Sequence, residues 1–170
     1  LGDSPNSPKH KFDVLDYKLN LDIYNCFLSP YPRSFTGSII VKFRIDTALS
    51  QITLNAVNTS LQINSDGMSG VSFTHASNIL TINLDRTYNP NEITQVLINY
   101  QHLNVSDQAF YASNGGVFTD AEPEGARKWF PCWDKRSDKA TLDMTVKVPL
   151  SVKIGSNGRL NDSLVTGDTI

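Results

Sequence analysis

The chain has 170 residues, a formal net charge of −2 at pH 7 and 39% hydrophobic residues, which is enough to fill a core. Its Lys and Arg residues are scattered and form no basic stripe, which argues against nucleic acid and against an anionic membrane surface as partners. No run approaches the ~18 apolar residues that a membrane-spanning helix needs.

The first residues differ from the rest of the chain. Residues 1–11, LGDSPNSPKHK, are polar and rich in proline. We interpret them as a flexible lead-in, or as what remains after removal of an upstream segment. Residues 12–170 are then predicted to form a single β domain.

Apolar residues alternate with polar ones over much of this domain, which is typical of half-buried strands. The alternating apolar positions are Leu19, Leu21 and Ile23; Ile39, Val41, Phe43 and Ile45; Leu80, Ile82 and Leu84; Val96, Ile98 and Tyr100; and Leu142, Met144, Val146 and Val148. Turn signals separate these runs at residues 29–32, 65–67, 89–91 and 156–158. No segment keeps a helical period beyond two turns. The predicted fold is therefore mainly β, a two-layer antiparallel β-sandwich or saddle.

Residues 115–141 concentrate acids, bases, aromatic residues and a cysteine between two predicted strands. Asp120, Glu122 and Glu124 occupy every second position, so an extended backbone would place their carboxylates on one face. Such a density of charged side chains is more typical of a binding edge than of the core of a strand.

Two prolines bound a predicted helical turn in the same segment. Pro123 disfavours the helical conformation at Glu122, and a short helix is expected just after it, within residues 124–129. Pro131 would end that helix. The sequence therefore predicts a carboxylate held beside a short helical turn.

The two cysteines, Cys26 and Cys132, are too few for a disulfide framework. Buried free thiols are the favoured interpretation, and a disulfide would require their α-carbons to lie within about 7 Å. Cys132 is disfavoured as a catalytic nucleophile, because the spacing of the three histidines around it indicates no general base.

The run GARKWFPCWD, preceded by FTDAEPEG and followed by DKAT, resembles the signature of the N-terminal domain in the aminopeptidase N family of zinc metallopeptidases, the gluzincin aminopeptidases. The strand-rich first half and the later GSNG turn extend this resemblance over most of residues 12–170. One departure affects the rigidity of the local turn. After Asp134 the family commonly has Glu-Pro, whereas this chain has Lys135-Arg136.

The resemblance implies that this domain is one part of a larger enzyme. The domain would pack against a thermolysin-like catalytic domain and form one wall of the active-site cleft, where Glu122 would hold the free α-amine of a peptide substrate. Asp120, where the family often has glutamine, would line the same pocket. A charge-assisted hydrogen bond of this kind is worth about 1.5–3 kcal/mol. Glu124 is expected to face solvent or to cap the helical turn.

Zinc is the cofactor that the resemblance implies for the full-length aminopeptidase, bound by an HExxH motif and a later glutamate. None of the three histidines here is followed by glutamate. The zinc ligands would therefore lie outside this chain, which we expect to be inactive alone. The chain ends at residues 165–170 in what reads as the start of a strand, so we interpret it as a truncated N-terminal domain.

The remaining residues of the signature are predicted to support the fold, namely Arg127, Pro131, Cys132, Asp134 and Lys139. Arg127 and Asp134 are spaced for an ion pair across the Pro131 turn, which Lys139 would join; an exposed pair of this kind is worth about 0–1 kcal/mol. The aromatic residues of the signature, Trp129, Phe130 and Trp133, are predicted to pack against the core.

A second class of function stays open, a free-standing β-sandwich module that binds glycan or protein through exposed Trp129 and Trp133. An HExxH helix further along the reading frame would decide for the aminopeptidase domain. Both a cytoplasmic and an exported location are compatible with the sequence.

Overall fold

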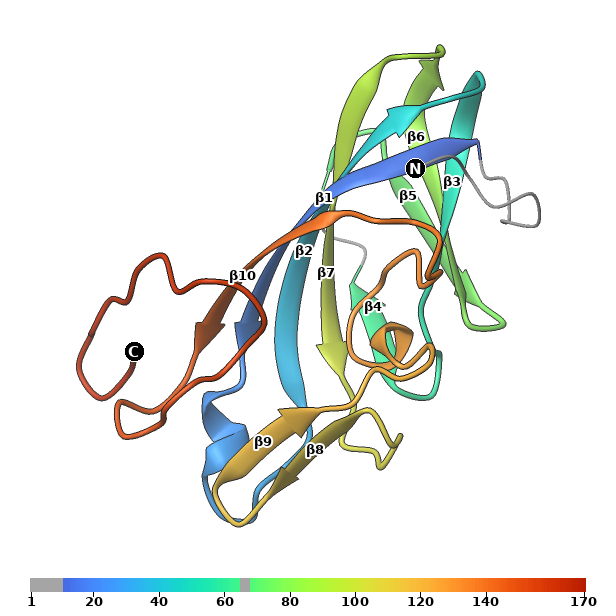
Figure 1. Ribbon diagram of the computed structural model, residues 1–170. Coiled ribbons are helices and arrows are strands. Elements are labelled where there is room, and N and C mark those ends of the chain that lie inside the picture. Colours follow the sequence, from blue (N-terminus) through green and yellow to red (C-terminus); the bar gives the residue numbers. More distant parts are fainter. Residues whose placement is uncertain (1–10, 65–67) are drawn as a thin grey trace.

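The computed structural model describes residues 11–64 and 68–170, and strands dominate it (Figure 1). The strands are β1 (Phe12–Asp22), β2 (Phe35–Ile45), β3 (Leu49–Asn55), β4 (Leu61–Asn64), β5 (Ser72–Ala76), β6 (Ile79–Tyr88), β7 (Ile93–His102), β8 (Phe110–Ser113), β9 (Gly116–Thr119) and β10 (Thr141–Lys147). Two 3-10 helices are η1 (Tyr24–Phe27) and η2 (Ala126–Lys128). The predicted lead-in, apart from its last residue, and the turn predicted at residues 65–67 lie outside the described residues.

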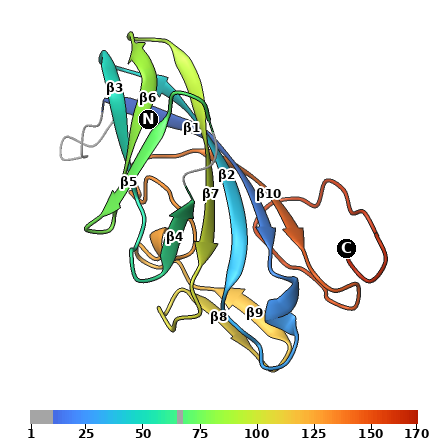
Figure 2. The ribbon, with the colours of Figure 1, turned by 180° about the vertical axis from the view of Figure 1, so that it is seen from behind.

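The strands form two main sheets and a separate hairpin (Figure 2). The larger sheet has the strand order β10-β1-β2-β7-β4, the smaller sheet has the order β3-β6-β5, and β8 pairs with β9. Neighbouring strands are antiparallel except β1 and β10, which run parallel. The mainly antiparallel, two-layer β fold predicted from the sequence is confirmed, with one parallel pair added at its edge.

Side-chain alternation builds one core between the two sheets. The larger sheet contributes fully buried Ile39 and Phe43, and the smaller sheet contributes Leu54 and Ile82. In β1 the alternation changes phase at an irregularity between Val14 and Asp16, so that Phe12 and Val14 are buried before it and Leu19 and Leu21 after it. On the edge strand β10 the predicted pattern is weaker, because Leu142 is 52% exposed.

Short turns position the segment of interest. Asn114 and Gly115, both with positive φ, join β8 to β9, an Asn-Gly pair of the kind that forms tight hairpin turns. The end of β9 at Thr119 leads directly into the acids at residues 120–124. From there the chain runs through η2 to β10, and in Figure 1 it lies beside β4.

The last residues do not begin a strand as the sequence suggested. Thr166 and Thr169 pair with each other across a turn at Gly167, and Ile170 exchanges two hydrogen bonds of 3.0 Å with Val148. These contacts fold the segment after β10 back on itself. Among the described residues, no helix is long and apolar enough to cross a membrane.

Candidate functional site

The acids predicted to form a site lie on a tight turn, residues 120–125, which we call the acidic turn. The carboxylate of Asp120 accepts the N–H of Glu122 at 3.2 Å, and the carbonyl of Ala121 accepts the N–H of Gly125 at 2.8 Å. The Glu122–Pro123 peptide bond is cis. The condition for all three carboxylates to share one face, an extended backbone, is therefore not met, because these hydrogen bonds curl the chain.

The three acids consequently have different surroundings. Asp120 is exposed and holds the turn together through its carboxylate. The Glu122 side chain is exposed, and its carboxylate has no hydrogen bond or ion pair with the described part of the chain. Glu124 was expected to face solvent or to cap the helical turn, but η2 has no side-chain cap hydrogen bond. Instead, Glu124 forms ion pairs with Arg127 at 2.6 Å and with Lys135 at 3.2 Å. The hydrogen bond from Lys135, together with the charge of Arg127, lowers the pKa of Glu124.

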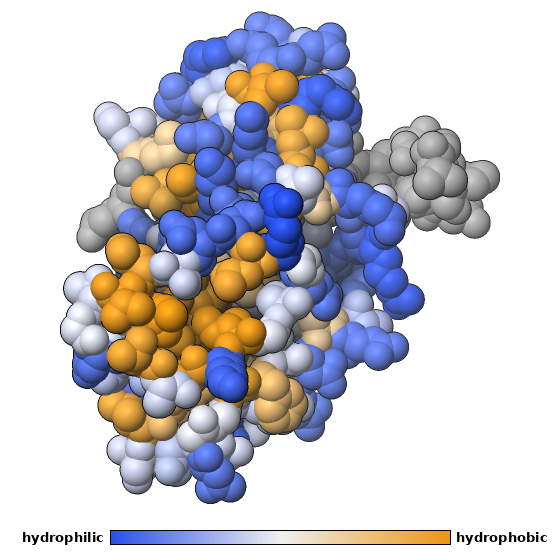
Figure 3. Space-filling view, turned by 60° about the vertical axis from the view of Figure 1, so that its left-hand side comes forward, coloured by the Kyte–Doolittle hydropathy of each residue, from blue (hydrophilic) through white to orange (hydrophobic). Residues whose placement is uncertain are grey.

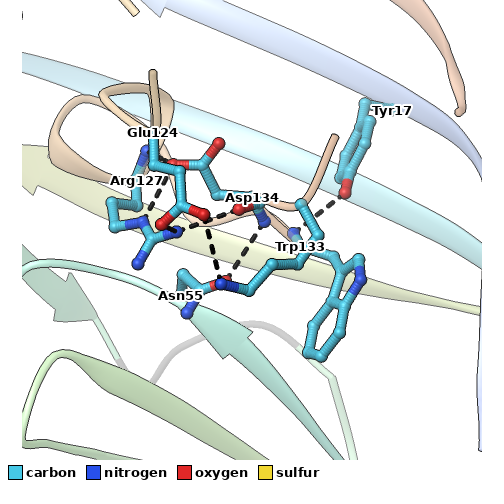
Figure 4. A network of polar contacts seen from close by, with 7 residues as sticks. Tyr17, Asn55, Glu124, Arg127, Trp133 and Asp134 are labelled. Atoms are coloured by element: carbon cyan, nitrogen blue, oxygen red, sulfur yellow. Dashed lines mark hydrogen bonds and ion pairs between the residues drawn. The ribbon is translucent and has the colours of Figure 1, made fainter. Parts of the chain in front are cut away.

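Arg127 is the centre of a polar cluster that we call the arginine network, formed with Asn55, Glu124, Asp134 and Lys135 (Figure 4). Its Nε donates to the Asp134 carboxylate at 2.9 Å, and its Nη2 donates to the Asp134 carbonyl at 2.9 Å. The predicted ion pair is thus confirmed. The Arg127 and Asp134 side chains are only 20% and 14% exposed, so this pair is shielded from solvent more than the prediction assumed.

The arginine network is attached to the sheets. The side-chain oxygen of Asn55, the last residue of β3, accepts the N–H of Asp134 at 3.1 Å, and the Asn55 backbone exchanges hydrogen bonds of 2.7 and 3.1 Å with Cys132. The Tyr17 hydroxyl of β1 accepts the N–H of Trp133 at 3.0 Å. The segment after η2 therefore has fixed points on both β1 and β3.

The residues predicted to support the fold mostly do so. The predicted helical turn is η2, shorter than residues 124–129, and Pro131 is buried just after it. Cys132 is 3% exposed and free, as is buried Cys26, so the preferred prediction of buried thiols is confirmed. Burial raises the pKa of the Cys132 thiol. The lysine was assigned wrongly, because Lys135 joins the network whereas Lys139 is exposed and forms no ion pair with the described residues.

The aromatic residues pack as predicted. Trp129 is 8% exposed and Phe130 is 7% exposed, and their rings meet edge to face with centroids 4.5 Å apart. Half-buried Trp133 packs on Phe12 at 5.9 Å. Trp129 is therefore not available as an exposed platform for a sugar.

A second polar cluster supports the acidic turn from its other side. The Ala109 carbonyl accepts the N–H of Asp120 at 2.8 Å, and the Ala109 N–H donates to the Asp107 carboxylate at 3.0 Å. Asp107 also pairs with fully buried His102 at 3.0 Å, and its carbonyl accepts Lys128 Nζ at 2.7 Å. Burial opposes the ionisation of Asp107, but the hydrogen bonds from His102 and from backbone N–H groups outweigh burial and lower its pKa.

The described residues do not fit a zinc site. No group of three or more His, Cys, Asp and Glu side chains among them is arranged to hold a metal ion. His75 Nε2 lies 2.9 Å from the Ala56 carbonyl, and both ring nitrogens of His102 have protein partners. Both ring nitrogens of His102 and one ring nitrogen of His75 are therefore occupied by hydrogen bonds within the protein.

The Glu122 side chain is exposed to solvent. A hollow of about 420 Å³ lies over the larger sheet, at Asn20, Ser38 and Asn99, and another of about 240 Å³ lies beside Trp133 and Asp134. Glu122 lines neither of them. A closed pocket around this carboxylate would need a second wall.

Sequence reasoning missed Asn55 and Lys135. Asn55 is too distant in the sequence to be associated with Asp134, and no local pattern indicates that contact. Lys135 did carry a signal, since it stands where the resembled family commonly has Glu. The ion pair from Lys135 to Glu124 supplies a local constraint of its own.

Comparisons with known proteins agree with this architecture. The family model for the peptidase M1 N-terminal domain matches residues 15–169. Aminopeptidase M1 of Arabidopsis thaliana is 28% identical over 178 residues, which cover 90% of this chain and 19% of that protein. Aminopeptidase M1-A of Oryza sativa subsp. japonica is also 28% identical, over 89% of this chain and 19% of its own length. The chain thus spans about a fifth of the curated relatives it matches.

Solved structures share the fold. A two-domain M1 zinc metallopeptidase mutant bound to L-arginine has a TM-score of 0.80 and 20% identity, over 95% of this chain and 38% of that one. A mutant M1 zinc metallopeptidase from Deinococcus radiodurans, bound to a Tyr-Ser-Ala substrate, has a TM-score of 0.79 and 20% identity, over 94% of this chain and 37% of that one. The match of the family model to nearly the whole chain decides the assignment: this chain belongs to the peptidase M1 N-terminal domain family.

Proposed function

We propose that this chain is the non-catalytic N-terminal domain of a zinc aminopeptidase that removes residues from the N-terminus of peptides. In this proposal the acidic turn forms part of one wall of the active-site cleft, and Glu122 binds the α-ammonium group of the substrate. Asp120 holds the turn in shape and lies beside the same group. The zinc ligands lie outside this chain, in the catalytic domain.

The observation that carries the proposal is a contrast at Glu122: its carboxylate has no partner within the described part of the chain, whereas its backbone is constrained. An ammonium group offers three donors and a positive charge, and an unpaired carboxylate is a matching acceptor. Tethers on both sides of the acidic turn reduce the ordering that binding would otherwise require. An internal peptide bond has no ammonium group, so such an anchor would favour cleavage at the chain end.

The surface of the chain supports a partner domain. Large apolar side chains after β10 are exposed, namely Leu150, Ile154, Leu160, Leu164 and Val165. In Figure 3, where the side that carries the C-terminal segment comes forward, hydrophobic side chains gather in a patch. Apolar patches of this kind usually mark a contact surface. We assign the enzyme's own catalytic domain as the partner.

The test is Glu122→Gln in the full-length enzyme, since glutamine keeps the size and one acceptor oxygen but removes the charge. The loss should be about 1.5–3 kcal/mol, or roughly ten- to a hundredfold in kcat/KM, for substrates with a free amine. N-acylated substrates, which cannot make this contact, should be affected little. Asp143→Asn, the same chemical change at an exposed position on β10, is the control and should leave both rates unchanged.

Equal losses for free and acylated substrates would show that Glu122 is structural. The alternative function, a glycan- or protein-binding module, depended on exposed Trp129 and Trp133. The burial of Trp129 removes half of that platform, so no observation favours it.

A further inference from the structure

We infer that Glu124 is a positioning residue for Glu122: by bridging Arg127 and Lys135, it fixes the acidic turn and keeps both cations away from the Glu122 carboxylate. This inference rests on the proposed function, in which Glu122 binds the substrate amine. It assigns a role to a residue that touches neither the substrate nor the reacting atoms.

The bridge holds both carboxylate oxygens of Glu124. Oε2 accepts Arg127 Nη2 at 2.6 Å, and Oε1 accepts Lys135 Nζ at 3.2 Å. The three side chains are between 20% and 37% exposed, so water competes only partly for these bonds. A carboxylate with a cation on each oxygen has little freedom to rotate, which restrains the backbone at Glu124.

Arg127 is itself held from its other side. Its Nε and backbone N–H both donate to the Asp134 carboxylate, at 2.9 and 3.2 Å, and Asn55 of β3 accepts the Asp134 N–H (Figure 4). The chain of contacts from Glu124 through Arg127 and Asp134 therefore ends on a core strand. These contacts fix the position of Glu124 relative to strand β3 in the core.

The acidic turn couples the position of the Glu124 backbone to that of Glu122. Only Pro123 separates the two glutamates, and the N–H of Gly125 closes the turn on Ala121 at 2.8 Å. A Cβ at Gly125 would lie 2.8 Å from the Asp120 carbonyl oxygen, so the two ends of the turn are in close contact. A shift at Glu124 must therefore move the neighbouring backbone that carries Glu122.

The bridge also has an electrostatic consequence. Arg127 and Lys135 are the two cations of the arginine network, and Glu124 and Asp134 engage them. With its partner charge removed, Lys135 becomes available to pair with another acid. Pairing with Glu122 would compete directly with the substrate ammonium group.

The experiment uses the full-length enzyme and a double-mutant cycle of Glu124→Gln with Glu122→Gln. Glu124→Gln should lower kcat/KM about tenfold for substrates with a free amine and much less for N-acylated ones, because the geometry of the anchor is lost. In the Glu122→Gln background the same change should cost less than about twofold, since residues that act through one another are not additive. Lys135→Met, which leaves the Arg127 pair intact, should give the same pattern with a smaller loss.

Glu92→Gln is the matched control. Glu92 also pairs with an arginine, Arg86 at 2.8 Å, but on the turn between β6 and β7. It should leave the preference for a free amine unchanged. Thermal unfolding of every variant checks that it remains folded.

The outcomes distinguish a failure of this inference from a failure of the proposed function. If Glu122→Gln abolishes the preference for a free amine while Glu124→Gln and Lys135→Met keep it, this inference is overturned and the proposed function stands. A full additional loss from Glu124→Gln in the Glu122→Gln background likewise overturns it. If Glu122→Gln leaves the preference unchanged, the proposed function fails, and the inference with it.

Discussion

Glu122 and Glu124 are the same residue type two positions apart, and only their partners distinguish them. Glu124 is bound by two cations, whereas the Glu122 carboxylate, on the same turn, has no hydrogen bond or ion pair with any described residue. Crowded acids are often structural, and at Glu124 that general expectation holds. The assignment of a binding role to one of them therefore depends on what each carboxylate oxygen contacts, which the spacing of the residues does not reveal.

Asp138 is an acid whose surroundings disfavour its charge. Burial, and next the charge and hydrogen bond of Asp13, raise the pKa of Asp138 to about 6. A carboxyl group with a raised pKa binds its proton more tightly in the folded state, so stability falls as the pH rises from about 4 to 6. Above pH 6 the full cost is present, and below about pH 4 it is absent because both states are protonated.

We therefore predict that Asp138→Asn stabilises the chain. The amide stands in for the protonated acid, and the free energy of unfolding at pH 7.5 should rise by about 1–2 kcal/mol, since solvent screens part of the unfavourable interaction at this partly exposed group. The gain should shrink below pH 6 and disappear near pH 4. Urea unfolding of both proteins across this pH range measures it, with Asp143→Asn as the control. A gain that is the same at pH 4 and pH 7.5 would contradict the electrostatic explanation.

At the scale of elements, the acidic turn is short but held from two directions. On one side the arginine network connects it to β3, and on the other the Asp120 N–H connects it to the loop after β7. Neither support is regular secondary structure. Binding residues are commonly found on loops that a rigid scaffold positions.

Gly125 allows the two ends of the turn to approach, and we predict that Gly125→Ala destabilises the chain. Its φ of −89° is open to any residue, so the cost is steric: the added Cβ would meet the Asp120 oxygen at 2.8 Å and the Ala121 Cα at 3.0 Å. Crowding of this kind typically costs about 1–3 kcal/mol. Chemical denaturation of the 170-residue chain provides the measurement.

Gly155→Ala is the matched control, because a Cβ there meets nothing within 4 Å. It should change the free energy of unfolding by no more than about 0.5 kcal/mol. Similar losses at both glycines would show that the close approach in the acidic turn is not the cause.

The sequence predicted those elements whose signal is local. Alternation located β1, β2, β6, β7 and β10 because one face of each strand is apolar, and the proline spacing located the turn at η2. The hairpin of β8 and β9 was missed although Asn114-Gly115 was a readable signal. The contact of Asn55 with Asp134 had no such signal, since it joins residues 79 positions apart.

The arrangement of the three acids differs from the simplest pattern where the local backbone is not extended. An extended backbone would have aligned three acids, but Asp120 accepts the N–H of Glu122 and turns the chain. Side chains of this type commonly bend the backbone that follows them. Lys139 was chosen as the ion-pair partner from the signature alone, whereas the folded loop brings Lys135 to Glu124.

At the scale of the whole molecule, the chain is about a fifth of the length of its curated relatives. Two features of its surface leave room for a partner domain. The apolar side chains after β10 are exposed, and Glu122 faces open solvent. Contact with a catalytic domain would cover the first and provide a second wall for the second. The two features thus support the same proposal from different parts of the surface.

In the proposed function this chain contributes to substrate binding, and the catalytic domain binds zinc. We therefore predict that the 170-residue chain, purified alone, holds no stoichiometric zinc and does not cleave an aminoacyl-anilide. The physical reason lies in its donors: both ring nitrogens of His102 have protein partners, no group of three or more His, Cys, Asp and Glu among the described residues is arranged to hold a metal ion, and no histidine is followed by the glutamate of an HExxH motif. Metal analysis by mass spectrometry and a chromogenic assay test both halves. The full-length polypeptide, prepared in the same way, is the positive control and should contain zinc and turn over. Stoichiometric zinc together with turnover in the isolated chain would mean that it contains a catalytic centre of its own, and the assignment of Glu122 to a wall of another domain's cleft would have to be abandoned.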